Sequence, residues 1–558
     1  MSSLWYVEGI HQVTELTKKV PNSGFDQERL EHPVPPPFPG IPVMAPPSSD
    51  SSPCHPGSSI LIDEGSLTEK QARRGTGKEF TKGDRCTYVF CTIACCDVDK
   101  CDIAQATIDM LPDVALLRIF DFLTDRGHIM GGEIPAWHRL VHVCRKWRNV
   151  IFGSPRRLDL LLYCRASTPV RQTLDVWPLL PIAIQVYRYD WSRWNEGNIM
   201  AALKHNNRIS EMYIFDPPYS EREKVLAALQ QPFPALTTLM LAFFTETALV
   251  VPASFLGGSA PDLQTLSLDR IPFPGLPNLL LTATHLVHLQ LHRIPYSGYI
   301  SPEAMVTALA VLTSLKALHI EFESPQSLPD RRPHPRTRVL LPVLTYLQLK
   351  GMGEYLEDLV ARIDAPLLDK LIITFFYQLI FDSPQLTQFM SRTPKFKAHN
   401  EALVVFTSYN VSITLPHTSD AVLQLRISCN QSDRQLSSLV QVCSSSIPRA
   451  LISTIERLRI ENESNWQDSE NGQWLELFRP FTAVKYLFVF SYFMPYIAPA
   501  LKELVGERVT EVLPALQTLQ LYGPLPPGPA QDTIDQFVAA RQLAGHPIAI
   551  SSSWCEGR

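Results

Sequence analysis

A short hydrophobic pattern recurs along most of the chain. Its form is apolar-x-x-Leu-x-apolar, as in LTTLML, LQTLSL and LKALHI. Most gaps between copies are 23 to 33 residues, and a gap of 54 after Leu371 predicts a degenerate copy, for which EALVVF around Leu403 is the candidate. Ten intervals then span the 280 residues from Leu239 to Leu519, a mean of 28, which indicates a repeat array. The central residues of the copies are Met212, Leu239, Leu266, Leu289, Leu318, Leu347, Leu371, Leu425, Leu458, Leu487 and Leu519.

The segments between these copies predict helices. Ser220 with Glu223 ahead of KVLAALQ fits a capping box. Ser301 and Ser383 each precede a proline and an apolar periodic run, as N-cap residues do. A purely helical repeat such as HEAT is disfavoured, because LTTLMLAFF and VKYLFVFSYF end in β-branched and aromatic residues that prefer strands. The prediction is an α/β fold, a leucine-rich-repeat solenoid with one strand and one helix per unit.

In such a solenoid the pattern leucines point inward, and the residues between them lie on the concave strand face. The surface they form is mixed and suits contact with a protein. Aromatic residues gather toward its C-terminal end, where burial under a helix or tail is the favoured alternative to a contact role. One column is Met240, Ser267, Gln290, His319, Gln348, Ile372, Arg426, Arg459, Phe488 and Gln520; the next is Ala242, Asp269, His292, Glu321, Lys350, Thr374, Ser428, Glu461, Phe490 and Tyr522.

A different pattern precedes the array. IDMLPDVALLRIFDFLTDRG predicts one amphipathic helix, which begins near Pro112, and PAWHRLVHVCRKWRNVIFGSP predicts a second. About 45 residues in two or three helices bury too little surface to be stable alone. Some apolar side chains must therefore be covered by the following domain or by another protein. The apolar positions are Leu116, Ile119, Phe120 and Leu123 in the first helix, and Trp137, Leu140, Val141, Cys144, Trp147 and Ile151 in the second.

These patterns divide the chain into four parts. Residues 1–105 hold eleven prolines between Pro21 and Pro56 and are expected to be a disordered leader. Residues 106–157 form the helical module, 158–528 the solenoid, and 529–558 a C-terminal helix and tail.

Composition narrows the function classes. The net charge of −5 favours neither nucleic acid nor an anionic membrane surface as a partner. No apolar run has the length of a signal peptide or a membrane span, so a cytoplasmic or nuclear protein with free thiols is expected. Five cysteines between Cys86 and Cys101 lack the paired spacing of a zinc site.

The order LPDVALLRIFDFL, then WHRLVHVCRKW, resembles the F-box, although Val114 stands where that motif usually has an acidic residue and Ala115 where it often has leucine. The array, with NIMAALKHNNRISEMYIF and QPFPALTTLML, resembles the divergent leucine-rich repeats of the large F-box families of mushroom-forming (basidiomycete) fungi. The likeness covers residues 108 to 525.

The resemblance implies a substrate receptor of an SCF-type ubiquitin ligase. The F-box would bind a Skp-family adaptor, and through it a cullin–RING ligase, while the solenoid holds an unidentified protein substrate. Trp147 and Ile119 are the residues most expected to lie in the module's own core instead. The implied adaptor-binding residues are Leu111, Pro112, Leu116, Ile119, Phe120, Leu123, Leu140, Val143, Cys144 and Trp147. The substrate-binding candidates are Gln290, His292, His319, Glu321, Gln348, Lys350, Arg426, Arg459, Phe488, Phe490 and Tyr522.

Motifs of catalysis are missing from the sequence. It has no Gly-x-Ser-x-Gly elbow, no Walker loop and no His-Glu-x-x-His. His292 and His319 are interpreted as lone histidines without an acidic or cysteine companion at ligand spacing, so neither a metal site nor a cofactor is expected. A repeat scaffold that acts without a ligase is the alternative function.

Overall fold

A computed structural model describes the chain over residues 111–124, 140–154, 160–166, 168–177, 179–186, 195–244, 249–325, 338–376, 382–397, 399–416, 422–428, 435–462, 473–504, 506–525 and 527–553. The chain divides into two units, Met1–Pro112 and Asp113–Arg558. Only Leu111 and Pro112 of the first unit are described, so the expected leader and its cysteines lie outside the described residues.

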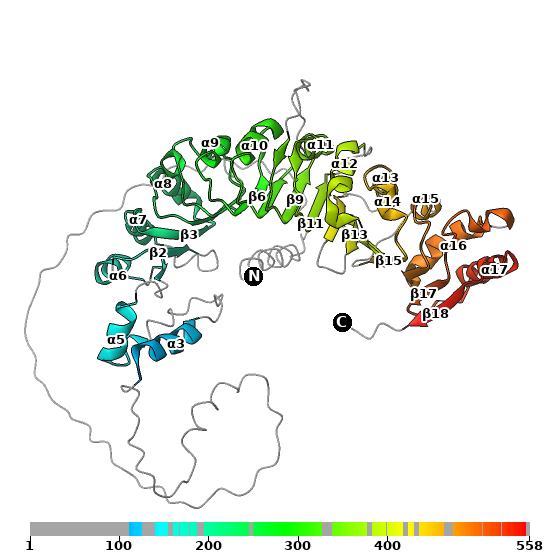
Figure 1. Ribbon diagram of the computed structural model, residues 1–558, viewed down its shortest axis with the longest axis horizontal. Coiled ribbons are helices and arrows are strands. Elements are labelled where there is room, and N and C mark those ends of the chain that lie inside the picture. The colour runs from blue at the N-terminus through cyan, green and yellow to red at the C-terminus, as the bar shows by residue number, and fades with distance from the viewer. Residues whose placement is uncertain are drawn as a thin grey trace, which may run out of the picture. The chain divides into compact units, whose positions relative to one another are not determined.

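The second unit is a mixed α/β repeat solenoid built on one long, mostly parallel sheet (Figure 1). Among the described residues this sheet has 16 strands, in the order β1-β2-β3-β4-β5-β6-β7-β9-β11-β14-β13-β12-β15-β16-β17-β18. The strands are β1 (Leu161–Tyr163), β2 (Ile182–Val186), β3 (Ile209–Phe215), β4 (Thr238–Ala242), β5 (Thr265–Asp269), β6 (His288–Ile294), β7 (Ala317–Phe322), β9 (Tyr346–Gly351), β11 (Lys370–Phe375), β12 (Glu401–Phe406), β13 (Asn410–Pro416), β14 (Val422–Ser428), β15 (Arg457–Asn462), β16 (Tyr486–Phe490), β17 (Thr518–Tyr522) and β18 (Ala549–Ser553). A separate pair consists of β8 (Val339–Leu340) and β10 (Ile363–Asp364).

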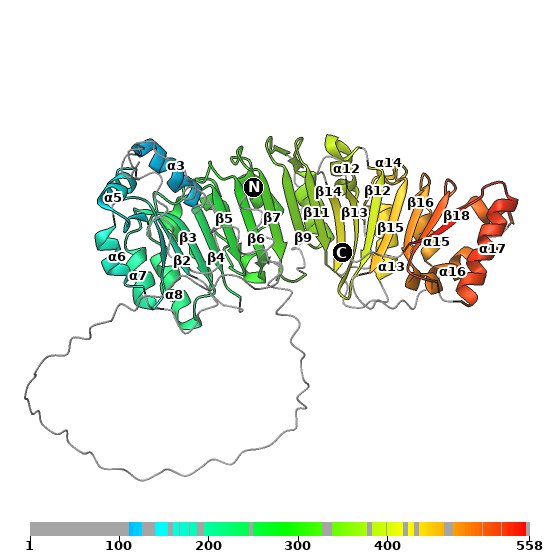
Figure 2. The same cartoon turned by 90° about the horizontal axis from the view of Figure 1, so that it is seen from below.

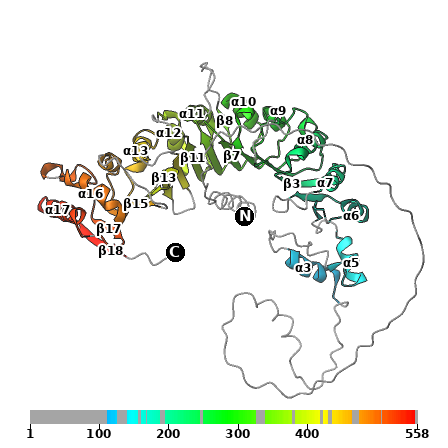
Figure 3. The same cartoon turned by 180° about the vertical axis from the view of Figure 1, so that it is seen from behind.

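Helices cover the outer side of the curved sheet, and the strands line its inner side (Figures 1 and 3). Seen from below, the strands run side by side along the array (Figure 2). The covering helices are α6 (Val170–Val176), α7 (Glu196–Leu203), α8 (Tyr219–Ala228), α9 (Leu276–Leu280), α10 (Pro302–Leu309), α11 (Gly353–Ala361), α12 (Pro384–Arg392), α13 (Gln435–Ser445), α14 (Arg449–Ile452), α15 (Trp474–Phe478), α16 (Met494–Lys502) and α17 (Pro529–Leu543). Short 3₁₀ turns complete several units: η5 (Phe255–Gly258), η6 (Tyr296–Gly298), η7 (Pro394–Phe396), η9 (Ser491–Phe493) and η10 (Gly506–Thr510).

The pattern leucines form the core, as predicted. They are buried from β3 to β17 except in β12, where Ala402 takes the core position and Leu403 is half-buried, and most lie in register, so that Leu239 pairs with Leu266. Most of the other buried apolar side chains of the strands lie on the same side of the sheet, where the helices cover them. The core is therefore a continuous column that no single unit could bury alone.

The predicted uniform unit is wrong in three places. In the described residues only the 3₁₀ turn η5 lies between β4 and β5, and only β8 lies between β7 and β9, where helices were expected. After β11, the chain places β12 three positions along the sheet, and β13 and β14 then fill the two places between them, with β13 antiparallel to both neighbours. The degenerate copy is thus a real strand, β12, and the strand that the repeat pattern did not predict here is β13, which lies between β12 and the next copy, β14.

The caps were predicted with mixed success. Ser301 caps α10, since its Oγ accepts a hydrogen bond from Ala304 N at 3.2 Å. The capping box at Ser220 is wrong: α8 begins earlier, after Pro218, so Ser220 already lies inside the helix. Ser383 holds the N-cap position of α12 without a capping bond, and its hydroxyl bonds to that of Ser446 instead.

At the N-terminal end of this unit lie α3 (Asp113–Thr124) and α5 (Arg145–Phe152), of which α5 is the nearer to α6 (Figures 1 and 3). Both helices were predicted. They contact each other through Phe120 and Trp147, whose rings meet edge to face with centroids 4.9 Å apart. Cys144 is the N-cap of α5, where its Sγ accepts a hydrogen bond from Trp147 N at 3.5 Å.

At the C-terminal end, the predicted helix is present as α17, but β18 was not predicted. This strand adds to the sheet parallel to β17. Arg541 of α17 is fully buried and donates hydrogen bonds to backbone carbonyls of the preceding unit, including those of Val509 at 3.0 Å and Leu516 at 3.2 Å. The guanidinium satisfies carbonyls that would otherwise be buried without partners.

Candidate functional site

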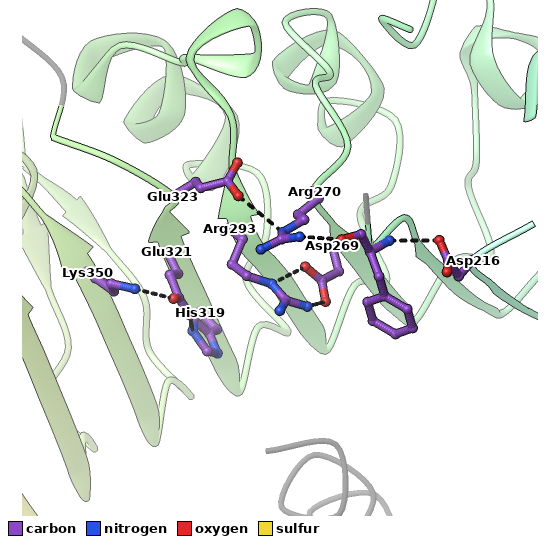
Figure 4. Close-up of polar contacts among 9 residues, drawn as sticks. Asp216, Asp269, Arg270, Arg293, His319, Glu321, Glu323 and Lys350 are labelled. Carbon is purple, nitrogen blue, oxygen red and sulfur yellow. Dashed lines mark hydrogen bonds and ion pairs between the residues drawn. The ribbon is translucent and has the colours of Figure 1, made fainter. Parts of the chain in front are cut away.

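The inner strand face carries a charged network where β3, β5, β6 and β7 end (Figure 4). Arg293 donates from Nε to Asp269 Oδ1 at 2.7 Å and from Nη2 to Asp269 Oδ2. Arg270 Nε lies 3.1 Å from Glu323 Oε1. Burial works against the charge of Arg293, but the bidentate bond with Asp269 outweighs it and raises the pKa of the guanidinium.

Three residues of this network have left-handed backbone conformations. They are Asp216 with a φ of 50°, Arg270 with 56° and Arg293 with 48°. Such angles are costly for residues other than glycine, and they persist only where the surroundings fix them. Here side-chain hydrogen bonds fix at least one of them, because Asp216 Oδ1 accepts from Phe244 N at 3.0 Å.

Glu321 connects this network to the neighbouring strands. Its Oε1 accepts a hydrogen bond from Lys350 Nζ at 2.6 Å, and its Oε2 lies 3.5 Å from His319 Nε2. Burial alone would raise the pKa of this carboxyl, but His319 and Lys350 outweigh it and hold the pKa below its ordinary value. Glu321 is therefore ionised at neutral pH.

Two histidines pack against each other beside Glu321. The rings of His292 and His319 meet edge to face, with centroids 4.1 Å apart. The ligand atoms of His292, His319 and Glu321 all lie within 4.8 Å of one another. The interpretation of lone histidines without an acidic companion is thus wrong. The signal was present in the sequence, because residues two apart on a strand share a face, and Glu321 follows His319 by two.

An aromatic cluster lies further along the inner face. Phe490 and Tyr522 have ring centroids 5.3 Å apart, and Phe488 and Tyr522 are stacked at 6.3 Å. These three side chains are half-buried, and Tyr486 is exposed. They point away from the helices, because Leu487 and Val489 fill the buried positions of β16. Of the favoured interpretation, burial under a helix or tail, the part that concerns a helix is wrong, and residues 554–558 of the tail lie outside the described residues.

The other candidates of the inner face are also half-buried. Arg459 lies 3.5 Å from Glu401 and 3.3 Å from Glu461, and its guanidinium lies over the Phe488 ring. Arg426 belongs to the second column rather than the first, because Leu423, not Leu425, pairs with Leu371. Leu423 and Leu425 both point into the core, because residues two apart on a strand share a face. The alternation of side chains along the strand therefore could not show which of the two pairs with Leu371. Gln290, Gln348 and Lys350 are half-buried on the same face.

The expected adaptor surface splits into buried and exposed parts. Leu116, Phe120, Leu140 and Trp147 are buried within the chain itself. Ile119 is 39% exposed and Val143 is 56% exposed, so the expectation that Ile119 belongs to the core is wrong. Their exposed apolar companions in α3 and α5 are Val114 and Phe152. Pro112 is exposed, Leu111 and Cys144 are half-buried, and the side chain of Leu123, like Trp137, lies outside the described residues.

The chain was compared with known proteins. No protein-family model and no curated protein sequence matches it. No helix in the described part of the chain is long and apolar enough to cross a bilayer.

Proposed function

We propose that this chain is the substrate receptor of an SCF-type ubiquitin ligase. The α3–α5 pair binds a Skp-family adaptor, which joins a cullin–RING ligase, and the inner face of the solenoid holds a protein substrate. In this role the chain works in the cytoplasm or nucleus, catalyses nothing itself and needs no cofactor. Its proposed lineage is the F-box family with divergent leucine-rich repeats found in mushroom-forming fungi.

The observation that carries the proposal is the exposure of apolar side chains on α3 and beside α5. Leu116, Phe120 and Trp147 fill the interior of the helix pair, yet Ile119 and Val143 stay open to solvent. The solenoid does not cover these two side chains in the described residues. Apolar side chains of this size, left exposed on a small helical module that follows an F-box-like pattern, favour a protein partner.

The inner face supports the second half of the proposal. It presents half-buried aromatic residues at one end and paired charges in the middle, without a strong net charge. Aromatic residues and arginines of this kind are common at the centres of protein interfaces. A repeat surface with this mixture suits a folded protein better than a nucleic acid, which favours an excess of basic residues.

A repeat scaffold without a ligase is the second candidate. It is favoured by the burial of Leu116, Phe120, Leu140 and Trp147, which leaves only part of the expected adaptor surface accessible. Val114 stands where the F-box motif usually has an acidic residue, and this departure also favours the scaffold.

The test is direct binding of a purified Skp-family adaptor to the full chain. We expect Ile119→Asp with Val143→Asp to weaken binding at least tenfold, because two charges would be buried in an apolar interface. Leu179→Asp with Leu543→Asp is the matched control, because those leucines are 88% and 90% exposed and belong to neither α3 nor α5. Wild-type protein that does not bind the adaptor at micromolar concentration supports the scaffold instead.

A further inference from the structure

We propose that His292, His319 and Glu321 form a binding site for a divalent transition-metal ion, with Zn²⁺ as the best fit. The site does not rest on the proposed function, because it would serve a ligase receptor and a scaffold equally. It lies on the inner face, on the adjacent parallel strands β6 and β7.

The donor set suits such an ion. Two imidazoles and one carboxylate are borderline ligands that favour zinc, copper and nickel over calcium or magnesium. Three protein ligands would leave one position of a tetrahedral zinc ion for water or for a donor atom of a bound molecule.

The ligand atoms of the three side chains lie nearly as close to one another as the ligands of a bound zinc ion do. Their ligand atoms lie within 4.8 Å of one another. Zinc bonds of about 2.0–2.2 Å place tetrahedral ligands about 3.4 Å apart, so a pair at the 4.8 Å limit would draw in by about 1.4 Å. We expect rotation of the three side chains to supply that movement.

His319 supplies an independent sign of a missing ligand. It is only 3% exposed, and among the described residues its Nε2 has no partner that meets hydrogen-bond geometry. Glu321 Oε2 lies 3.5 Å away on the same side. A buried ring nitrogen without a hydrogen bond is costly, and a metal ion bound between it and the carboxylate would remove that cost.

The surrounding charges allow a cation and also limit its affinity. Lys350 bonds to Oε1 of Glu321, which leaves Oε2 directed toward His319 and holds the carboxylate in place, as an outer partner of a metal ligand does. Asp269 and Glu323 add negative charge, whereas Arg293 and Arg270 add positive charge. The cluster is therefore close to neutral before the ion binds.

The test uses the full chain without a polyhistidine tag, stripped of metal by a chelator and titrated with Zn²⁺ against a chromophoric competitor. We expect His292→Gln and Glu321→Gln each to lose one equivalent of tight binding or to weaken it at least tenfold, the lower end of what even an outer partner contributes. His288→Gln is the matched control, because His288 lies on the same strand outside the cluster, and it should bind as the wild type does.

A second measurement separates this site from the cysteines. Co²⁺ bound by nitrogen and oxygen gives visible absorption without the near-ultraviolet band of cobalt bound to thiolate. We expect the first kind of spectrum in the wild type and its loss in Glu321→Gln. Equal stoichiometry and affinity in wild type and both variants, or a thiolate spectrum alone, would overturn the site.

Discussion

The charged pairs of this solenoid differ from one another mainly in how deeply their side chains are buried. Asp216 and Arg222 form a pair whose side chains are 1% and 2% exposed, with Arg222 Nη2 2.8 Å from Asp216 Oδ1. Arg222 also donates from Nε to Pro217 O at 3.0 Å and lies over the Phe243 ring. By contrast, Arg479 and Glu476 form a pair at 2.9 Å in which both side chains are about half exposed.

Loss of one partner should therefore cost far more at the buried pair. We expect Arg222→Met to lower the free energy of unfolding by about 3–5 kcal/mol, because it leaves the Asp216 carboxylate buried without its cation. Arg479→Met should cost less than about 1 kcal/mol. Chemical denaturation, followed by circular dichroism, measures both.

The double variant Arg222→Met with Asp216→Asn completes the cycle. It should be less destabilised than the sum of the two single variants, since it removes both charges together. Asparagine also tolerates the left-handed backbone at position 216. Additive effects within about 0.5 kcal/mol would contradict a coupled pair.

Side-chain direction was the most predictable property at this scale. The alternation of side chains along a strand predicted which residues point into the core, and the central residues are buried in all the copies except the degenerate one, where Ala402 rather than Leu403 is buried. The partner of each residue was less predictable. His292 and Glu321 come from adjacent strands, and the repeat pattern placed them side by side in the second column, but it gave no sign of the register shift between Leu291 and Ile294 of β6.

Among the elements, α12 shows how one repeat supports the next. Its first backbone N–H groups are not capped by Ser383, the residue at the N-cap. Glu357 of α11 accepts hydrogen bonds from Gln385 N and Leu386 N, each at 2.8 Å, and its side chain is nearly buried. A carboxylate at a helix N-terminus also interacts favourably with the helix dipole.

We expect Glu357→Gln to destabilise α12 by about 0.5–2 kcal/mol, the usual range for loss of a helix cap. Hydrogen exchange should report faster exchange at the amides of Gln385 and Leu386, because their acceptor loses its charge. Glu354→Gln on the same helix is the control, since that side chain is exposed. Equal exchange rates in the two variants would show that Glu357 does not cap α12.

Element type followed from the sequence wherever the hydrophobic pattern was complete. Strands were predicted at each copy, and β12 was found even in the degenerate gap. The antiparallel strand β13 was missed because its sequence, NVSITLP, lacks the repeat pattern. Its backbone pairs with β12 and β14, which a regular array would place next to each other. Strands β1, β2 and β18 were missed for the same reason, since terminal repeats depart from the pattern.

At the scale of the whole molecule, each repeat contacts chiefly its neighbours. Parallel strands pair with the next strand along, and the covering helices pack in sequence, as α16 does on α17. The stability of such an array is close to a sum of units and the interfaces between them. A change at one end should therefore loosen that end first, while distant units keep their structure.

A truncation after Pro527 provides the clearest test of this behaviour. It removes α17 and β18, and with them Arg541, Ile534 and Phe537, all of which are buried. The edge of β17 and the side of α16 would then meet water, and four backbone carbonyls would lose the guanidinium. Hydrogen exchange should accelerate in β15–β17 and stay unchanged in β3–β7. A truncation after Ser553, which leaves α17 and β18 in place, should change neither region. Equal acceleration along the entire sheet would mean that the solenoid unfolds as one cooperative unit, and the nearest-neighbour description of its stability would fail.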